Sequence, residues 1–243
     1  MSVDITLEEF TEKIKSIQTP NKVWEALMGY VDSFGIDALS YYHIAPPGSL
    51  DFSEKYFLAI GFEEDLAAEH RRNHDLFSSP FTSHSNPVTE PIFWPQAYEK
   101  LNLTPKQQDH LNKFYCQNSA NGLVLPVYGP NSRNGCVVLR FADPLCRFSR
   151  LSIHAVNFAA YHAHLHFCRL RAKNQKNVVH LTQREQEVLT WVARGKSNSV
   201  IADIVGISQH TVNGYLRRIY LKTQTSDRTS AALRAIGDSL IDF

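Results

Sequence analysis

The chain has 243 residues, 43% of them hydrophobic, and its 25 Lys and Arg nearly balance its 24 Asp and Glu. This length suits two domains with ordinary cores, and the balance excludes a strongly basic or acidic protein. The sequence contains no apolar run long enough to span a bilayer and no signal peptide, so we expect a cytoplasmic protein without a membrane partner.

The first 171 residues alternate between helical and extended patterns. Apolar periodicity and capping residues predict helices over 6–17, 20–31, 62–73, 104–119 and 149–171. Alternating or β-branched runs predict strands over 37–44, 54–60, 123–128 and 136–141. Pro-rich turns are expected around Pro80, Pro87, Pro91 and Pro95. The order predicts an α+β fold, an α/β/α sandwich that resembles PAS and GAF sensor domains.

A polar, basic linker is expected over 172–179, and four short helices over 180–243 form a separate all-α domain. Thr182 stands three residues before Glu185, as in a capping box, and Gly195 suits the end of that helix. Further on, Gly206 ends a short apolar-faced helix and Ser208 can cap the next one. A helix, a tight turn and a second helix make a helix-turn-helix.

The second helix of this motif has two distinct faces. Its apolar stripe predicts a buried face at Val212, Leu216 and Ile219. Its polar face and the following basic residues predict the DNA-binding set Gln209, His210, Asn213, Arg217, Arg218 and Lys222. Gln and Asn can pair with adenine, Arg with guanine or phosphate, and the later cations, with Arg228, suit phosphates. The alternative is a solvated face on an ordinary helical hairpin.

Residues 177–243 hold eight Lys and Arg against six Asp and Glu, so the domain is only weakly basic. We therefore expect DNA contact to depend on a local stripe of charge and on a homodimer that doubles it. A two-fold dimer implies double-stranded DNA with an inverted-repeat site.

The C-terminal domain resembles the LuxR/GerE family of DNA-binding domains over about sixty residues. The family pattern is matched by Leu181, Thr182, Arg184, Glu185, Glu187, Val188, Leu189, Gly195, Ile201, Ala202, Ile207, Ser208, Thr211, Val212, Leu216, Ile219 and Lys222. The preceding order of helices and strands is similar to the autoinducer-binding domain of quorum-sensing LuxR regulators. This resemblance implies a transcription regulator with a small-molecule sensor.

The sensor pattern is only partly matched. The family has a Trp and a Tyr four apart, then an Asp-Pro pair, a second Trp and a Gly. Those positions fall here on Leu66, His70, Ser79-Pro80, Trp94 and Gly122. The resemblance implies that the family's first Trp and its Asp hold the carbonyl and amide of an acyl-homoserine lactone. Leu66 has no donor and Ser79 has no carboxylate, which costs about 1–3 kcal/mol per lost group. An ordinary lactone is therefore disfavoured.

The predicted ligand site consists of Phe62, Leu66, His70, Ser79 and Trp94. His70 and Ser79 could bind a differently polarised head group. Phe62, Leu66 and His70 share one helical face, which could equally be plain core. Inward strand residues could also contribute, and the candidates left open are Tyr41, Tyr56, Leu139 and Phe141.

Cysteines and histidines give no recognisable metal motif. Cys116, Cys136, Cys146 and Cys168 lack CxxC spacing, and we expect them to be reduced. His162 and His166 share a face of the last sensor helix, but no nearby Glu completes an HExxH motif. We therefore expect no metal and no cofactor other than the signal, and assign this face to solvent or to a dimer contact.

The leading hypothesis is a two-domain LuxR-type transcription regulator controlled by a small apolar signal, which resembles a LuxR solo. Two alternatives are a ligand-independent regulator and one that still answers a lactone through a rearranged pocket. A phospho-receiver is not expected, because the N-terminal half lacks alternating strands and helices with an acidic cluster. An enzyme is not expected, because the sequence has no nucleophile elbow or phosphate loop.

Overall fold

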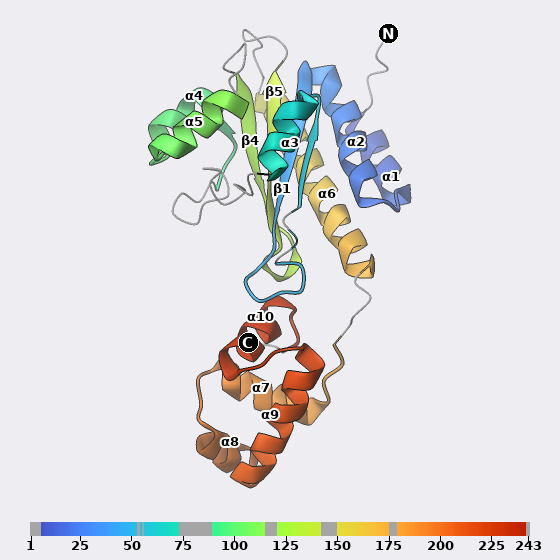
Figure 1. The fold of residues 1–243 in the computed structure, drawn as a ribbon. Coiled ribbons are helices and arrows are strands. Elements are labelled where there is room, and N and C mark those ends of the chain that lie inside the picture. Colours follow the sequence, from blue (N-terminus) through green and yellow to red (C-terminus); the bar gives the residue numbers. More distant parts are fainter. Residues whose placement is uncertain are drawn as a thin grey trace. The chain divides into compact units, whose positions relative to one another are not determined.

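A computed structural model describes residues 6–52, 54, 56–72, 89–114, 121–141, 150–174 and 179–241. The chain divides into two compact units, one of Met1–Ile44 with Lys55–Asn174 and the other of Ala45–Glu54 with Gln175–Phe243. Figure 1 shows the helices and strands of both. In these described ranges no helix is long and apolar enough to cross a membrane.

The first unit is built on a five-stranded antiparallel sheet with the strand order β2-β1-β5-β4-β3. The strands are β1 (Ile36–Ile44), β2 (Phe57–Ile60), β3 (Ile92–Phe93), β4 (Gly122–Val127) and β5 (Asn134–Phe141). In the central pair Tyr41 lies opposite Val137, and β5 continues the register with Val138 opposite Val124. The sheet therefore places side chains of three long strands in rows on each face.

Helices cover both faces of this sheet. On one side lie α1 (Leu7–Ser16), α2 (Pro20–Val31) and α6 (Arg150–Asn174), with α2 against β1 and α6 against β4. The other side carries α3 (Glu64–Arg72), α4 (Trp94–Lys100) and α5 (Pro105–Phe114), and α4 packs against β3 and β4 (Figure 1). The predicted α+β sandwich is confirmed. Two 3₁₀ turns complete the described elements, Asp32–Phe34 and Pro130–Ser132.

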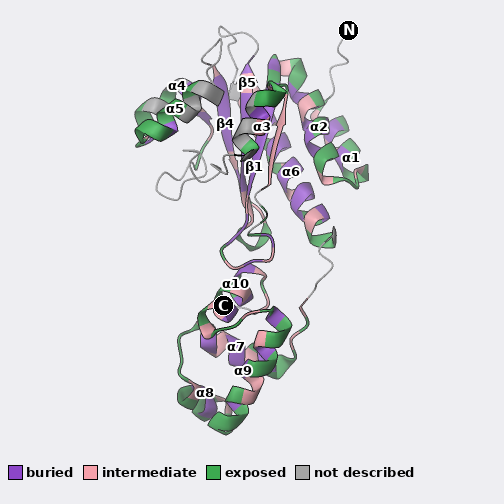
Figure 2. Ribbon diagram, viewed as in Figure 1, coloured by how far each residue is buried: buried purple, intermediate pink, exposed green. Residues whose placement is uncertain are grey.

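The sheet separates two apolar clusters, and its central strands are the most deeply buried part of the unit (Figure 2). The cluster against α2 and α6 includes Trp24, Leu27, Tyr41, Leu139 and Phe167. The cluster against α4 consists of Tyr42, Ile92, Trp94, Leu101, Val124, Cys136 and Val138, with Phe57, Ala59, Phe62 and Leu103 packed around it. Strand alternation explains the division, because successive residues point to opposite faces.

Most predicted elements are present, with small shifts at their ends. The helix at Pro20–Val31 has the predicted bounds, and Thr6 forms a full capping box with Glu9 at the start of α1. The sequence did not predict β3 and α4, because Pro91 and Pro95 are typical turn residues. Pro95 is accommodated in the first turn of α4, where a backbone N–H has no intrahelical acceptor to lose.

The second unit contains the predicted four helices around one core. They are α7 (Gln183–Ala193), α8 (Asn198–Val205), α9 (Gln209–Thr223) and α10 (Arg228–Gly237). The fully buried side chains come from every helix, namely Val188, Leu189, Ile201, Val212, Ile219, Ala231 and Ala235. No single short helix could bury such a stripe alone, so the four helices stabilise each other.

Candidate nucleic-acid interface and signal site

Local capping sets the geometry of the helix-turn-helix. Ser197 caps α8 by accepting from the Val200 amide, and Gly206 ends it with a left-handed φ of 71°. Ser208 then accepts from the Thr211 amide at 3.0 Å and starts α9. The tight turn therefore depends on a residue without a Cβ and on a strong N-cap two residues later.

The two faces of α9 are those that the sequence predicts. Val212, Leu216 and Ile219 are buried in the core of the second unit. The opposite face is exposed along its length, at Gln209, His210, Asn213 and Arg217. These four residues follow the helical repeat, so their side chains share one side of α9.

A hydrogen-bonded chain fixes one of these residues. The Asn213 Oδ1 accepts from the Asn198 Nδ2 at 2.7 Å, and the Asn198 Oδ1 accepts from the Arg228 guanidinium at 2.9 Å. Arg228 also donates to the Lys196 carbonyl. Arg228, which looked suited to phosphates, thus links the start of α10 to the start of α8. Asn198 was missed because its partners lie 15 and 30 residues away.

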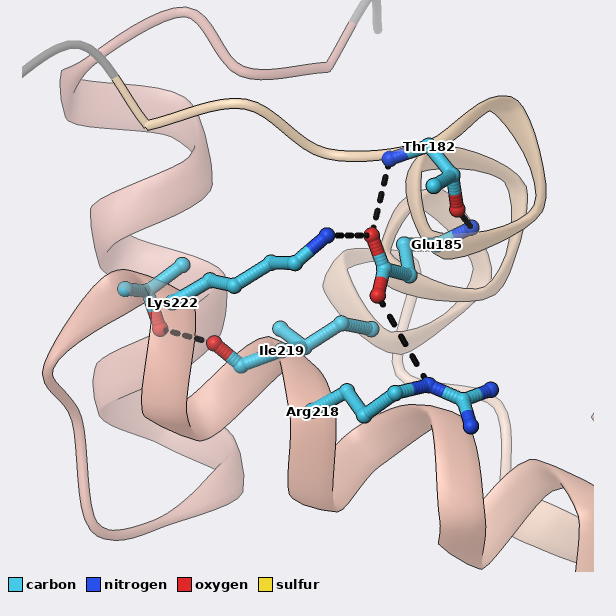
Figure 3. A network of polar contacts seen from close by, with 6 residues as sticks. Thr182, Glu185, Arg218, Ile219 and Lys222 are labelled. Atoms are coloured by element: carbon cyan, nitrogen blue, oxygen red, sulfur yellow. Dashed lines mark hydrogen bonds and ion pairs between the residues drawn. The ribbon is translucent and has the colours of Figure 1, made fainter.

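A second network joins α7 to the C-terminal half of α9 around Glu185 (Figure 3). The buried carboxylate accepts from the Lys222 Nζ at 2.6 Å and from the Thr182 amide at 2.8 Å. The Arg218 Nε lies 3.8 Å from its other oxygen. Burial is the largest single influence and raises the pKa of Glu185, but the hydrogen bonds from Lys222 and Thr182 outweigh it and lower that pKa.

The predicted cations of α9 therefore differ in their surroundings. Lys222 is held by Glu185 within the fold. Arg218 lies near the same carboxylate and also stacks over the Tyr215 ring, with its guanidinium 4.6 Å from the ring centroid. Arg217 extends from the exposed face beside Asn213. Arg217 thus shares its face with the candidate base-reading side chains, while Arg218 and Lys222 also hold the domain together.

In the sensor unit, Trp94 is buried against the sheet. It is 2% exposed and belongs to the cluster on the α4 face. A Cβ on Gly122 would overlap the Trp94 indole and the Leu139 carbonyl, so this position needs glycine. The predicted Phe62 packs at the edge of the same cluster, with the Arg140 guanidinium 5.1 Å above its ring. The structure therefore brings Phe62 and Trp94 to one face.

The remaining predicted ligand residues are not described in the same detail. Leu66 and His70 belong to α3, but their side chains lie outside the described part, as does the whole of Ser79. The structure assigns the strand residues that the sequence left open to one face of the sheet. Tyr41, Leu139 and Phe141 belong to the α2 and α6 face, and Tyr56 packs there too, away from Trp94.

Two further residues on the Trp94 face were not predicted from the sequence. Tyr42 is 1% exposed within the Trp94 cluster, and Ser40 is fully buried two residues earlier in the same strand. Alternation along β1 gives both side chains the face opposite Tyr41. Ser40 is thus a polar group on the sheet face that carries Trp94. Only the register of β1 within the sheet could identify it.

Comparison with known protein families gives two matches that together span most of the chain. Residues 19–167 match the family described as the autoinducer binding domain. Residues 179–235 match the family of bacterial regulatory proteins of the luxR family. The first match alone covers more than half of the chain.

Individual relatives agree with these matches. The chain is 31% identical over 167 residues to the HTH-type transcriptional regulator y4qH of Sinorhizobium fredii, a match that covers 68% of the chain and about half (51%) of that relative. It is 25% identical over 245 residues to the transcriptional activator protein AhyR of Aeromonas hydrophila, covering 97% and 92% of the two chains.

Among solved structures, Escherichia coli SdiA aligns with a TM-score of 0.72 at 17% identity, covering 98% of both chains. SdiA in complex with octanoyl-rac-glycerol aligns with a TM-score of 0.69, also at 17% identity, covering 95% and 93%. These alignments show that the two chains share a fold.

Proposed function

Because the chain belongs to the LuxR family of DNA-binding transcriptional regulators with an autoinducer-binding domain, we propose that its DNA binding is controlled by a small apolar signal other than an ordinary acyl-homoserine lactone. The observation that carries the proposal is the chemistry of two positions. Leu66 and Ser79 stand where the family pattern has the Trp and Asp that hold a lactone head group. Neither replacement supplies an indole donor or a charged acceptor.

The proposed site lies on the Trp94 face of the sheet, with Phe62, Leu66, His70 and Ser79 as further contacts. Phe62 and Trp94 supply apolar surface. Ser40 adds a hydroxyl on the same face, and His70 and Ser79 add polar groups for a head group that differs from a lactone. The complex of SdiA with octanoyl-rac-glycerol supports the idea that this fold can hold an acyl chain on a non-lactone head.

Two probes with the same acyl length test this proposal. Thermal unfolding of the full-length protein is measured with 1-octanoyl-rac-glycerol and with N-octanoyl-homoserine lactone. A ligand that binds only the folded state raises the melting temperature with its concentration. We expect the glycerol ester to stabilise the sensor more than the lactone does. A larger shift with the lactone would refute the proposal in favour of a rearranged lactone pocket, and no shift with either, or with lipid extracts, would favour ligand-independent regulation.

For DNA, we propose that the exposed face of α9 enters the major groove. Gln209, His210 and Asn213 would contact base edges. The cations Arg217, Arg218 and Lys222 would supply charge near phosphates, the last two from their places beside Glu185. The Asn198 contact supports this assignment for Asn213, because it holds the amide in one orientation before DNA arrives.

The test uses duplexes selected from a random library by the purified protein. Asn213→Ala should lower affinity for the selected sequence by about 5- to 100-fold, as expected for one bidentate base contact. Arg217→Gln should reduce the slope of log K against log salt by about 0.9 if it contacts one phosphate. Arg184→Gln is the matched control, because it removes the same charge from α7, where Arg184 pairs with Glu187, and not from the exposed face of α9. An unchanged affinity in Asn213→Ala would exclude this face.

We also propose a homodimer through α6. A groove of about 710 Å³ runs between α1 and α6, with apolar walls at Leu7, Ile14, Phe158 and Leu165. Phe158 and Tyr161 on α6 are 47% and 40% exposed, which is costly unless another surface covers them. A second copy is the favoured occupant, because the weakly basic DNA-binding domain gains affinity from a two-fold partner. Phe158→Ser should shift sedimentation equilibrium toward the monomer, and an unchanged dimer would exclude this surface.

A further inference from the structure

Four polar side chains meet inside the sensor unit, on the sheet face opposite Trp94. Tyr41 and His43 come from β1, and His164 and Cys168 come from α6; none is more than 6% exposed. The Tyr41 hydroxyl lies 2.8 Å from the His164 Nδ1 and 3.2 Å from the His43 Nδ1. The Cys168 Sγ lies 4.0 Å from the His164 Nδ1 and 3.6 Å from the His164 Nε2. Such a set is unusual in an apolar core.

The backbone is built to allow this close approach. Tyr41 and His43 are two apart in a strand, and His164 and Cys168 are four apart in a helix, so each pair shares a face. Gly129, which follows β4, closes the cluster. A Cβ there would lie 2.7 Å from the His164 Nε2 and 3.2 Å from the Cys168 Sγ. Only a glycine leaves space for the imidazole and the thiol at this point.

We propose that His43, His164 and Cys168 bind a soft d¹⁰ cation, Cu⁺ or Zn²⁺. One nitrogen or sulfur atom from each of the three lies within 4.8 Å of the others. Bonds of about 2.0–2.3 Å to a central ion place such ligands roughly 3.3–3.9 Å apart. Each side chain therefore needs to move by about 1 Å or less. Two imidazoles and one thiolate form a donor set that prefers copper and zinc over harder cations.

The second coordination shell also fits a metal. The Arg133 carbonyl lies 2.9 Å from the His164 Nε2, so this nitrogen carries the proton and donates, and the Nδ1 keeps its lone pair on the side of Tyr41 and His43. The Tyr41 hydroxyl, which bridges both Nδ1 atoms, is the oxygen available as a fourth ligand.

Charge distinguishes the two ions. Cu⁺ with one thiolate and two neutral imidazoles is a neutral unit, whereas Zn²⁺ with the same ligands keeps one positive charge. A net charge in an apolar interior is costly, and Trp24 and Phe167 pack against Tyr41 of this cluster. We therefore expect the protein to take Cu⁺ from a Cu⁺ chelator more readily than it takes Zn²⁺ from a Zn²⁺ chelator of equal affinity.

The test is a competition with chromophoric chelators for Cu⁺ and for Zn²⁺, using reduced, metal-free, full-length protein under anaerobic conditions. We expect one equivalent of ion per chain. Cys168→Ser should weaken binding at least 100-fold, because it removes the anionic ligand. Cys136→Ser is the matched control, since Cys136 is likewise a buried cysteine outside any disulfide but belongs to the Trp94 cluster, and it should bind as the wild type does.

Two further measurements keep the result interpretable. Thermal unfolding of each metal-free variant shows whether that variant is folded. If Cys168→Ser does not fold, His43→Asn tests the loss of a different ligand. Refolding from urea with each ion removes any barrier to entry into a buried site. The proposal is overturned if neither ion binds after refolding, or if Cys168→Ser and His43→Asn bind as tightly as the wild type. Tighter binding of Zn²⁺ than of Cu⁺ would keep the site and reverse the order expected from charge.

Discussion

The pair formed by Lys222 and Glu185 allows a quantitative test of what holds the DNA-binding domain together. The perturbation is Lys222→Met, which keeps the length of the side chain and removes its ammonium. The hydrogen bond that is lost is 2.6 Å long and ends on a carboxylate whose side chain is 2% exposed. After the substitution that carboxylate keeps the Thr182 amide, while Arg218 is 3.8 Å away.

The expected magnitude follows from burial. Removing one partner of a fully buried ion pair costs about 3–5 kcal/mol. Lys222 is 38% exposed and Arg218 can move toward the carboxylate, so solvent screening and this second cation reduce the loss to about 2 kcal/mol. Glu185→Gln should cost only about 1 kcal/mol, because Gln can still accept from the Thr182 amide in a capping box.

The assay is amide hydrogen exchange of α9 peptides in the full-length protein, read by mass spectrometry. A loss of about 2 kcal/mol raises the population of the open state, and so the exchange rate, by about 30-fold. Arg184→Met is the matched control, because its bond to Glu187 is also 2.6 Å long but its side chains are 58% and 38% exposed; we expect less than about 0.5 kcal/mol.

A double-mutant cycle supplies the refutation. Glu185→Gln with Lys222→Met should cost less than the sum of the single changes, with a coupling free energy of about 1 kcal/mol. If the two costs simply add, or if α9 of Lys222→Met exchanges at the wild-type rate, then this ion pair does not hold α7 to α9.

Three further predictions concern single residues. Gly122→Ala should destabilise the sensor by about 1–3 kcal/mol because its Cβ overlaps a buried indole, whereas Gly29→Ala, with open space around it, should be neutral or stabilising in thermal unfolding. Gly206→Ala should lower the free energy of unfolding by about 1 kcal/mol, because Gly206 has a φ of 71°. Gly214→Ala, inside α9, should raise it by up to about 1 kcal/mol. Equal effects of the two changes in urea unfolding would contradict the left-handed cap. Burial raises the pKa of Glu185, but its hydrogen bonds hold the net pKa below 4.5. The contribution of Glu185 to the free energy of unfolding is therefore full above that pH and is lost as the pH falls through the native pKa. Glu185→Gln should remove that part of the acid dependence of α9 exchange, and an unchanged profile would show that Glu185 is not its source.

The sequence by itself determined the features that depend on near neighbours. The capping box at Thr182, the N-cap at Ser208 and the glycine turn at Gly206 each involve residues within three or four positions. The buried and exposed faces of α9 follow from helical periodicity alone. These local signals explain why the four-helix domain and most of the sensor elements could be predicted.

Other features depend on pairs that lie far apart in the chain, and only the tertiary structure decided them. The register of β1 in the sheet places Tyr42 beside Trp94 and sends Tyr41 to the opposite face. Periodicity gives two faces to a strand but does not say which one a helix such as α4 will cover. That ambiguity left the strand residues of the signal site open.

The same limit applies to polar contacts. Glu185 meets Lys222 across 37 residues, and Tyr41 meets His164 across 123. In the sequence, His164 was one of several histidines on a helix, and the pair with obvious ligand spacing was His162 and His166. Packing of α6 brings His164 to Tyr41 of β1, whereas His166, which is also buried, lies against the Ile17 carbonyl. The sequence thus determined which elements form, and packing determined which of their side chains meet.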